Sequence, residues 1–320
     1  MSRTTKIGLI VAGSLVLIGC ILFVCVMSAL NWDFKKLSTV KFETNTHEIS
    51  ETFSDISLST DTADIAFALS DDGRCRVECH EEENAKHTVT VENGVLTVRI
   101  NDQRSWYDHI GFHFGLSKVT VYLPKAEYSA LSIHESTGNI KIPKDCSFGD
   151  VDISSTTGNV DFSASAAKSI KIKTRTGNIR VENLSVDAID LSTTTGTVNV
   201  SGVTCEGSLT VGVSTGKACL TDIACESVIS GGSTGDLTLN HVIAKNKISI
   251  ERSTGAVQFK RCDAGEIYIE TNTGDVTGSL LSSKVFITRT DTGDVHVPET
   301  ITGGRCEIHT DTGNIEIKLD

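Results

Sequence analysis

A Thr-Gly pair recurs ten times between residues 137 and 313 of this chain, at intervals of 19 or 20 residues. Asn or Asp usually follows the pair, and then Val or Ile. A period this regular is typical of a stacked repeat, in which each unit buries its apolar face against its neighbours. The repeat glycines are Gly138, Gly158, Gly177, Gly196, Gly216, Gly235, Gly255, Gly274, Gly293 and Gly313.

Apolar residues keep fixed places around each repeat glycine. They lie seven and five residues before it and two and four after it, as Ile170, Ile172, Ile179 and Val181 do around Gly177. Spacing of two is strand alternation, so each repeat has two short strands with one face inward, and the Thr-Gly pair is the corner between them. A third apolar pair often follows at seven and nine, which indicates a third face and therefore a coil, not a hairpin.

These features predict an all-β fold, a parallel β-solenoid (β-helix-like) of about ten coils, with its handedness left open. At a strand spacing of about 4.8 Å, ten coils make a rod about 50 Å long. We expect the corner glycine to adopt a positive backbone dihedral and the following Asn or Asp to bond its own backbone. Two coils depart from the pattern: Ser230 takes an inward position, and the apolar pair Val285 and Ile287 falls one residue early, which predicts a bulge.

Residues 7–30 carry no charge and are mostly apolar, enough to span a bilayer after a short cytoplasmic tail at 1–6. The segment is longer than the core of a cleaved signal peptide. We therefore expect a single-pass cell-membrane protein, bound to the lipid bilayer through residues 7–30, with the repeats outside the cell. Leu17-Ile18-Gly19-Cys20 also resembles a lipobox, which leaves lipidation of Cys20 open.

Residues 31–130 are expected to form a β-rich part that precedes the solenoid proper at 131–320. It contains a degenerate first coil with Ala63 in place of glycine, and an inserted hairpin around Asn93-Gly94. A polar and aromatic loop follows at 101–115, with Trp106, Tyr107, Phe112 and Phe114. The last coil ends at Asp320 without a distinct cap, and an open parallel edge predicts edge-to-edge self-association at the C-terminal coil.

The Val-x-Val-x-Leu-Pro segment at 119–124, followed by the serial Thr-Gly-Asn/Asp repeats, resembles the bacterial putative-adhesin family of uncharacterised β-solenoid domains. The resemblance covers residues 40–320. It implies a solenoid on a membrane-anchored envelope protein of a Gram-positive bacterium, with an adhesive role or a part in the cell-envelope stress response. It supplies no catalytic motif.

Searches for catalytic spacing give little. His80-Glu81 would need a second His at position 84 for a metalloprotease, where Asn84 stands, and there is no phosphate loop, dinucleotide fingerprint or nucleophile elbow. His109 and His113 lie four apart in the loop, a spacing without defined geometry there. Acidic residues at the corners of the last three coils are the weak candidates for a Ca²⁺ site, against the simpler reading as turn aspartates: Asp275, Asp291, Asp294 and Asp311.

Ten cysteines would suggest disulfides in an extracellular chain, but their positions argue against that. Cys75 and Cys79 are four apart in an apparent strand, beyond disulfide reach, and Cys205, Cys225, Cys262 and Cys306 fall at inward positions. We interpret most of them as buried free thiols.

Charge excludes one class of partner. Residues after position 30 hold 41 acids and 27 bases, a formal net charge of −14, which disfavours nucleic acid and anionic polymers. We therefore expect a non-enzymatic interaction protein with no cofactor and a protein or cell-wall partner. A cell-wall polysaccharide lyase or hydrolase on a β-helix scaffold is the alternative.

Overall fold

The computed structural model describes residues 2–33, 41–102 and 115–320. The four aromatic residues of the predicted loop, together with His109 and His113, lie outside the described residues. The chain begins with one helix, α1 (Arg3–Ala29), which is long and apolar enough to cross a membrane and whose apolar window is not buried against the protein. This is the property that the uncharged segment predicts.

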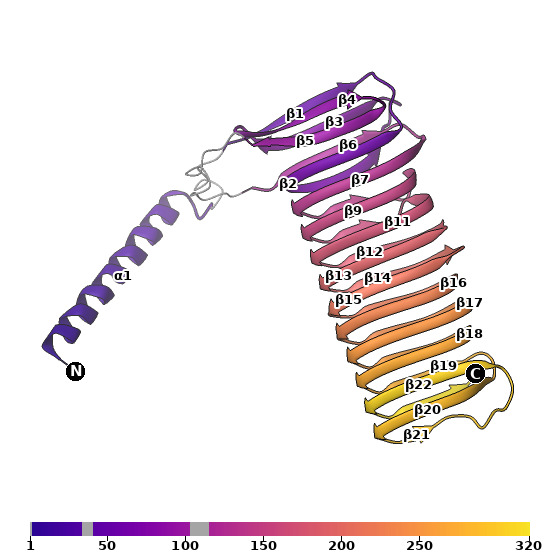
Figure 1. Ribbon diagram of the computed structural model, residues 1–320. Coiled ribbons are helices and arrows are strands. Elements are labelled where there is room, and N and C mark those ends of the chain that lie inside the picture. The colour runs from indigo at the N-terminus through magenta and orange to yellow at the C-terminus, as the bar shows by residue number, and fades with distance from the viewer. Residues whose placement is uncertain (1, 34–40, 103–114) are drawn as a thin grey trace.

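All other elements are strands, wound into one continuous sheet (Figure 1). Before the first repeat corner they are β1 (Phe42–Ile49), β2 (Asp55–Leu69), β3 (Cys75–Glu82), β4 (Ala85–Glu92), β5 (Val95–Asp102), β6 (Ser117–Leu123) and β7 (Glu127–Thr137). Those of the next coils are β8 (Ile140–Ile142), β9 (Ser147–Thr157), β10 (Val160–Phe162), β11 (Ser165–Thr176), β12 (Ile179–Val186), β13 (Ala188–Thr195), β14 (Val198–Cys205) and β15 (Ser208–Thr215). The last are β16 (Ala218–Thr234), β17 (Leu237–Thr254), β18 (Val257–Thr273), β19 (Val276–Leu280), β20 (Lys284–Thr292), β21 (Val295–His296), β22 (Gly304–Thr312) and β23 (Ile315–Leu319).

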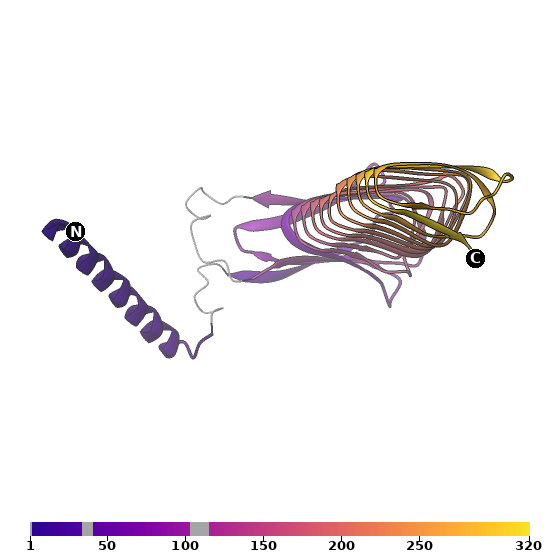
Figure 2. The same cartoon turned by 90° about the horizontal axis from the view of Figure 1, so that it is seen from below.

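The repeats form the predicted parallel β-solenoid. Each coil pairs in parallel with the next at equivalent positions, as Ile170 does with Ile189 and Ile179 with Val198. Viewed along the rod, the coils nearly superimpose (Figure 2). The inward positions on all three faces join one buried aliphatic core, so each coil depends on its neighbours to exclude water.

The repeat glycines are required by the stacking itself. Their φ angles lie between 128° and 156°, as a positive dihedral at the corner predicts. At Gly196, a Cβ atom would lie 2.0 Å from the carbonyl oxygen of Gly177, the corner of the coil before. The corresponding distance at the other nine corners is 1.7 to 2.2 Å, so each corner lies too close to its neighbour for any side chain.

Where Asn or Asp follows the corner glycine, its side chain bonds to the neighbouring coil, and not to its own backbone as the sequence suggested. Asn159 Oδ1 accepts the backbone N–H of Asn178 at 2.9 Å, and Asn178 Oδ1 accepts that of Thr197 at 2.9 Å. A line of such bonds runs along the corner and ties successive coils together. Strand pairing already occupies the local backbone groups, which leaves the side chain to reach across the stack.

A second corner comes six residues after the glycine. Its residues have φ between 53° and 63°, the left-handed region where the chain turns from the second face to the third: Asn183, Gly202, Asp222, His241 and Arg261. Asn, Gly, Asp and His are the residue types enriched in this conformation, whereas Arg rarely adopts it. Arg261 therefore holds a strained turn that the stack imposes.

The N-terminal end of the rod is closed by antiparallel strands. The first coil is β2, whose Thr62 pairs with Thr137, so Ala63 does stand at the position of a corner glycine. On its outer side β5 pairs with the first half of β2 and β6 with the second half. The hairpin of β4 and β5 turns at Asn93-Gly94 as predicted, and β3 and β1 add to β6. This antiparallel cap covers one end of the parallel stack.

At the other end, the coils do not follow chain order. The last coil in sequence, β22 and β23, lies between the coil of β18 and β19 and that of β20 and β21. Figure 1 shows β20 and β21 outermost. The prediction that the C-terminal coil forms the open edge is therefore wrong, because β22 and β23 are paired on both sides. Among the described residues no strand covers the outer side of β20 and β21.

Packing explains this exchange. The inserted coil offers Cys306 and Ile308 to the core, both 1% exposed or less, whereas the outermost coil offers Phe286 and Thr288 at the same positions. Placing the more aliphatic coil inside buries more apolar surface. The bulge predicted in this coil is also wrong, since β20 pairs with β22 without a register shift, and Val285 and Ile287 instead point outward and are exposed.

The cysteines are free, and seven of them are buried. Burial raises the pKa of the Cys225 and Cys306 thiols to about 12. They act as small core residues, as interpreted from their inward positions.

Candidate binding groove

Only part of the predicted acidic stack forms. Because the last coil is inserted, Asn314 lies between Asp275 and Asp294 in the corner line. Asp275 Oδ1 accepts the N–H of Asn314 at 2.7 Å, and Asn314 Oδ1 accepts that of Asp294 at 2.9 Å. Asp291 and Asp311 do fall at the same position on adjacent coils, and Asp291 pairs with Arg289 at 3.0 Å. The stack of like charges on which the Ca²⁺ hypothesis depends is therefore reduced to this one pair, because an amide separates the other two carboxylates.

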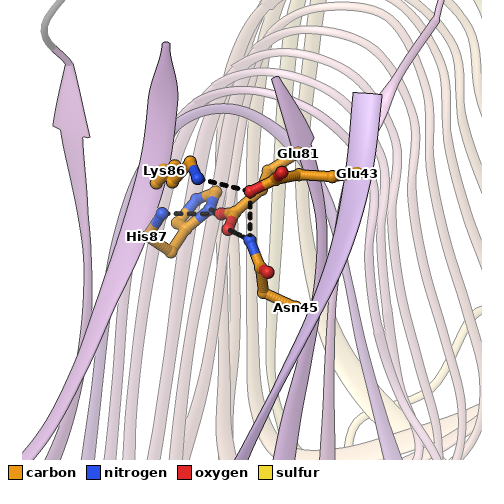
Figure 3. Close-up of polar contacts among 5 residues, drawn as sticks. All are labelled: Glu43, Asn45, Glu81, Lys86 and His87. Carbon is orange, nitrogen blue, oxygen red and sulfur yellow. Dashed lines mark hydrogen bonds and ion pairs between the residues drawn. The ribbon is translucent and has the colours of Figure 1, made fainter. Parts of the chain in front are cut away.

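A polar network, buried at Glu81 and His87 and exposed at Lys86, lies in the N-terminal cap between β1, β3 and β4 (Figure 3). The Glu81 carboxylate accepts the backbone N–H of His87 at 2.6 Å and lies 2.7 Å from its ring Nδ1. It also accepts Asn45 Nδ2 at 2.8 Å, and Asn45 in turn donates to Glu43, which pairs with Lys86. The network ties three strands of the cap together.

Cys79, Glu81 and His87 also meet a basic geometric requirement of a metal site, since their ligand atoms lie within 4.8 Å of one another. The thiol of Cys79 does not favour the thiolate form that binds a metal, because burial and the nearby Glu81 raise its pKa to about 12. Glu81 already has three hydrogen-bond partners in the protein. We interpret the group as a structural tie. Sequence reasoning missed it because its members come from two strands with no ligand spacing.

A candidate site on the solenoid is a shallow groove of about 610 Å³ across six coils near the Thr-Gly corners. Its residues belong to the strand segments that end at each Thr-Gly corner, from β11 to β18. The residues two before the glycine are exposed and point their polar side chains along it: Thr194, Ser214, Ser233, Ser253 and Asn272.

The groove is hollow where side chains are missing. Gly212 and Gly231 occupy the outward position four before the corner on two adjacent coils. A Cβ at Gly231 would meet nothing within 4 Å. The next two coils carry Glu251 and Glu270 at this position, paired with each other in register, and they form an acidic rim. The groove thus offers hydroxyl and amide hydrogen bonds beside two exposed carboxylates, with Arg252 beneath it.

The sequence pattern did not single out this groove. The predicted site residues, the corner glycines, lie along one side of it and position it, while its own lining is made of Ser, Thr and Gly in outward positions. The one signal in the sequence was Ser230, an inward polar residue in an otherwise aliphatic series, which lies next to it along β16.

Comparison with known proteins identifies the family of the chain. Residues 53–217 and 206–320 match the family described as Toastrack DUF4097. None of the curated proteins matches the sequence. Among solved structures the chain is similar to a putative adhesin from Bacteroides fragilis (15% identity, 87% of this chain and 97% of that one, TM-score 0.44). A second is a putative adhesin from Parabacteroides merdae (15% identity, 77% of this chain and 98% of that one, TM-score 0.46). A third is a putative lipid binding protein from Parabacteroides distasonis (15% identity, 86% of this chain and 97% of that one, TM-score 0.48).

Proposed function

This chain belongs to the Toastrack DUF4097 family, and from its architecture we propose that it is a membrane-anchored, extracellular interaction protein of adhesin type. In this proposal α1 anchors the chain with the N-terminus inside the cell, and the solenoid projects outward. The groove face contacts the partner. The groove is the observation that carries the proposal, because it is a hydrogen-bonding surface on a rod whose interior is occupied by aliphatic packing.

A binding role fits this surface better than catalysis. Hydroxyls, an amide and exposed carboxylates spread over several coils suit recognition of an extended polar partner through many weak contacts. Glu251 and Glu270 are both solvent-exposed. A lyase or hydrolase would instead need an acid and a base whose environments differ.

The anchor is tested by fractionation. Full-length protein should stay in the membrane pellet after alkaline carbonate extraction, and external protease should remove the repeats from intact cells. A soluble secreted form that begins near Asn31 would refute the anchor.

The contact surface is tested by cell retention on surfaces coated with cell-wall polysaccharide or with protein. Cells that carry the full-length chain should be retained on one of them more than cells without it. Gly231→Leu fills the groove and should reduce retention at least fivefold. Thr204→Leu adds the same side chain at an exposed position on the third face and should leave retention unchanged. Equal retention of cells with and without the chain would contradict the proposal.

A further inference from the structure

Arg252 is a charged residue inside the rod. It lies three before its corner, a position that faces inward and that is occupied by Thr174, Thr193 and Thr271 in other coils. Only 3% of the surface of Arg252 is exposed to solvent. On the coils either side, Gly232 and Thr271 pair with it in register. A guanidinium therefore sits where the neighbouring coils have small or polar side chains.

The guanidinium has too few partners. Its Nη2 donates to Ser230 Oγ at 2.9 Å, which explains the polar residue in the aliphatic series. Its Nε and Nη1 are buried without a partner, and so is Thr271 Oγ1 beside it. Among the described residues no carboxylate pairs with it, and burial lowers its pKa. A buried charge without a counter-charge is strongly unfavourable, and an anion at this place would relieve that cost.

The wall between Arg252 and the groove is thin. Arg252 itself lines the groove, together with Gly231 and Gly232 of the coil before it. A Cβ at Gly232 would lie only 2.2 Å from Arg252 Nη1, so the absent side chain makes room for the guanidinium. Ser230, Gly232 and Arg252 thus form one arrangement across two coils, in which a residue that lines the groove carries two unused donors.

We propose that the groove binds a molecule with a single carboxylate on a neutral, hydroxyl-rich body, such as a uronic acid, with Arg252 as the partner of the carboxylate. This rests on the proposed function, since it names the ligand class of the same groove. Glu251 and Glu270 on the rim disfavour a polyanion, because every added negative charge would face them. The exposed row of Ser, Thr and Asn side chains suits the hydroxyls of such a body.

The test measures binding to purified full-length protein in detergent by titration calorimetry at constant ionic strength. The probes are galacturonate, neutral galactose, acetate and inorganic phosphate. Galacturonate should bind at least tenfold more tightly than galactose, because galactose lacks the charge. It should also bind at least tenfold more tightly than acetate and phosphate, because these lack the hydroxylated body. Equal binding of galacturonate and galactose overturns the role of Arg252. Equal binding of acetate, phosphate and galacturonate overturns the sugar body in favour of a free anion.

Variants separate the site from general stability. Arg252→Gln should weaken galacturonate binding at least tenfold, whereas Arg180→Gln, an exposed arginine on the same rod, should not change it. If Arg252→Gln does not fold, Gly231→Leu gives an independent test, since that side chain enters open space and blocks the groove. Unchanged galacturonate binding in Gly231→Leu refutes the site. This assay is independent of cell retention, so either proposal can fail while the other stands.

Discussion

Glu135 gives the sharpest prediction about stability, because it is a carboxyl group inside the rod. It lies at the inward position three before Gly138 and is 6% exposed. One carboxylate oxygen accepts the Ala63 N–H at 3.1 Å, and the other has no partner. Burial raises its pKa from 4.5 to about 7. The folded protein therefore holds a proton on Glu135 at pH values where the unfolded chain has released it.

The direction of the pH effect follows from this difference. Between pH 4.5 and 7 the folded state binds more protons at this group than the unfolded state, so its contribution to stability falls as pH rises and then levels off above about pH 7. A difference of about 2.5 pKa units corresponds to about 3 kcal/mol, of which about 2.5 kcal/mol is lost between pH 5 and pH 8. The loss is confined to one group and can be removed by one substitution.

Glu135→Gln keeps an oxygen for the Ala63 N–H and cannot ionise. Its free energy of unfolding by urea, measured on the full-length protein in detergent, should rise relative to the native protein by about 2.5 kcal/mol from pH 5 to pH 8. Any cost of the buried amide is the same at each pH and does not affect this slope. Glu127→Gln, an exposed acid on the same strand, should show no such slope. A flat difference between Glu135→Gln and the native protein would refute the argument.

Three more predictions concern the core, the corners and the acidic coils. In urea unfolding, Ile250→Asp should destabilise the protein by about 4 kcal/mol and Thr254→Ala by less than about 1 kcal/mol, because Ile250 is fully buried and Thr254 is exposed. Similar costs for the two variants would refute the assignment of Ile250 to the inward face. Gly196→Ala should lower the free energy of unfolding by about 3 kcal/mol and Gly231→Ala by about 0.5 kcal/mol or less, because only the Cβ at position 196 would clash with a neighbouring coil. Equal losses would contradict the explanation that stacking requires the corner glycines. Millimolar Ca²⁺ should shift the melting temperature no more than sodium chloride does at matched ionic strength, because Asn314 separates Asp275 from Asp294. A saturable shift with Ca²⁺ alone that is lost in Asp275→Asn would instead establish a cation site.

The sequence predicts the coil well because two short-range rules decide it. Residues such as Ile170 and Ile172 must alternate to face one core, and Gly177 must lack a side chain to pass its neighbour. Both requirements repeat in every coil, so ten copies make them visible. The second corner was missed because its residue type changes from coil to coil: Asn183 and Gly202 favour a left-handed turn, whereas Arg261 adopts it against its own preference.

The order of the last coils could not be read from the sequence, for a related reason. Every corner presents nearly the same backbone to its neighbour, so a coil can stack on any other coil with equal ease. What distinguishes the arrangements is the difference in apolar burial between Cys306 and Ile308 on one coil and Phe286 and Thr288 on the other. Such a comparison needs the packed structure, because the periodic pattern assigns both coils to the stack without ranking them.

The same regularity gives meaning to the places where the pattern breaks. A solenoid needs only small or apolar side chains at inward positions, and stacking alone gives no reason for Arg252, or for a serine at 230 and a glycine at 232 that accommodate it. Ser230 would be aliphatic if stability alone mattered, and it accepts one bond from a guanidinium whose other donors stay unused. A buried arginine at this cost, in a groove that spans six coils, is explained by a ligand and not by folding. The deviation from the repeat, and not the repeat itself, is therefore where the function of this rod should be sought.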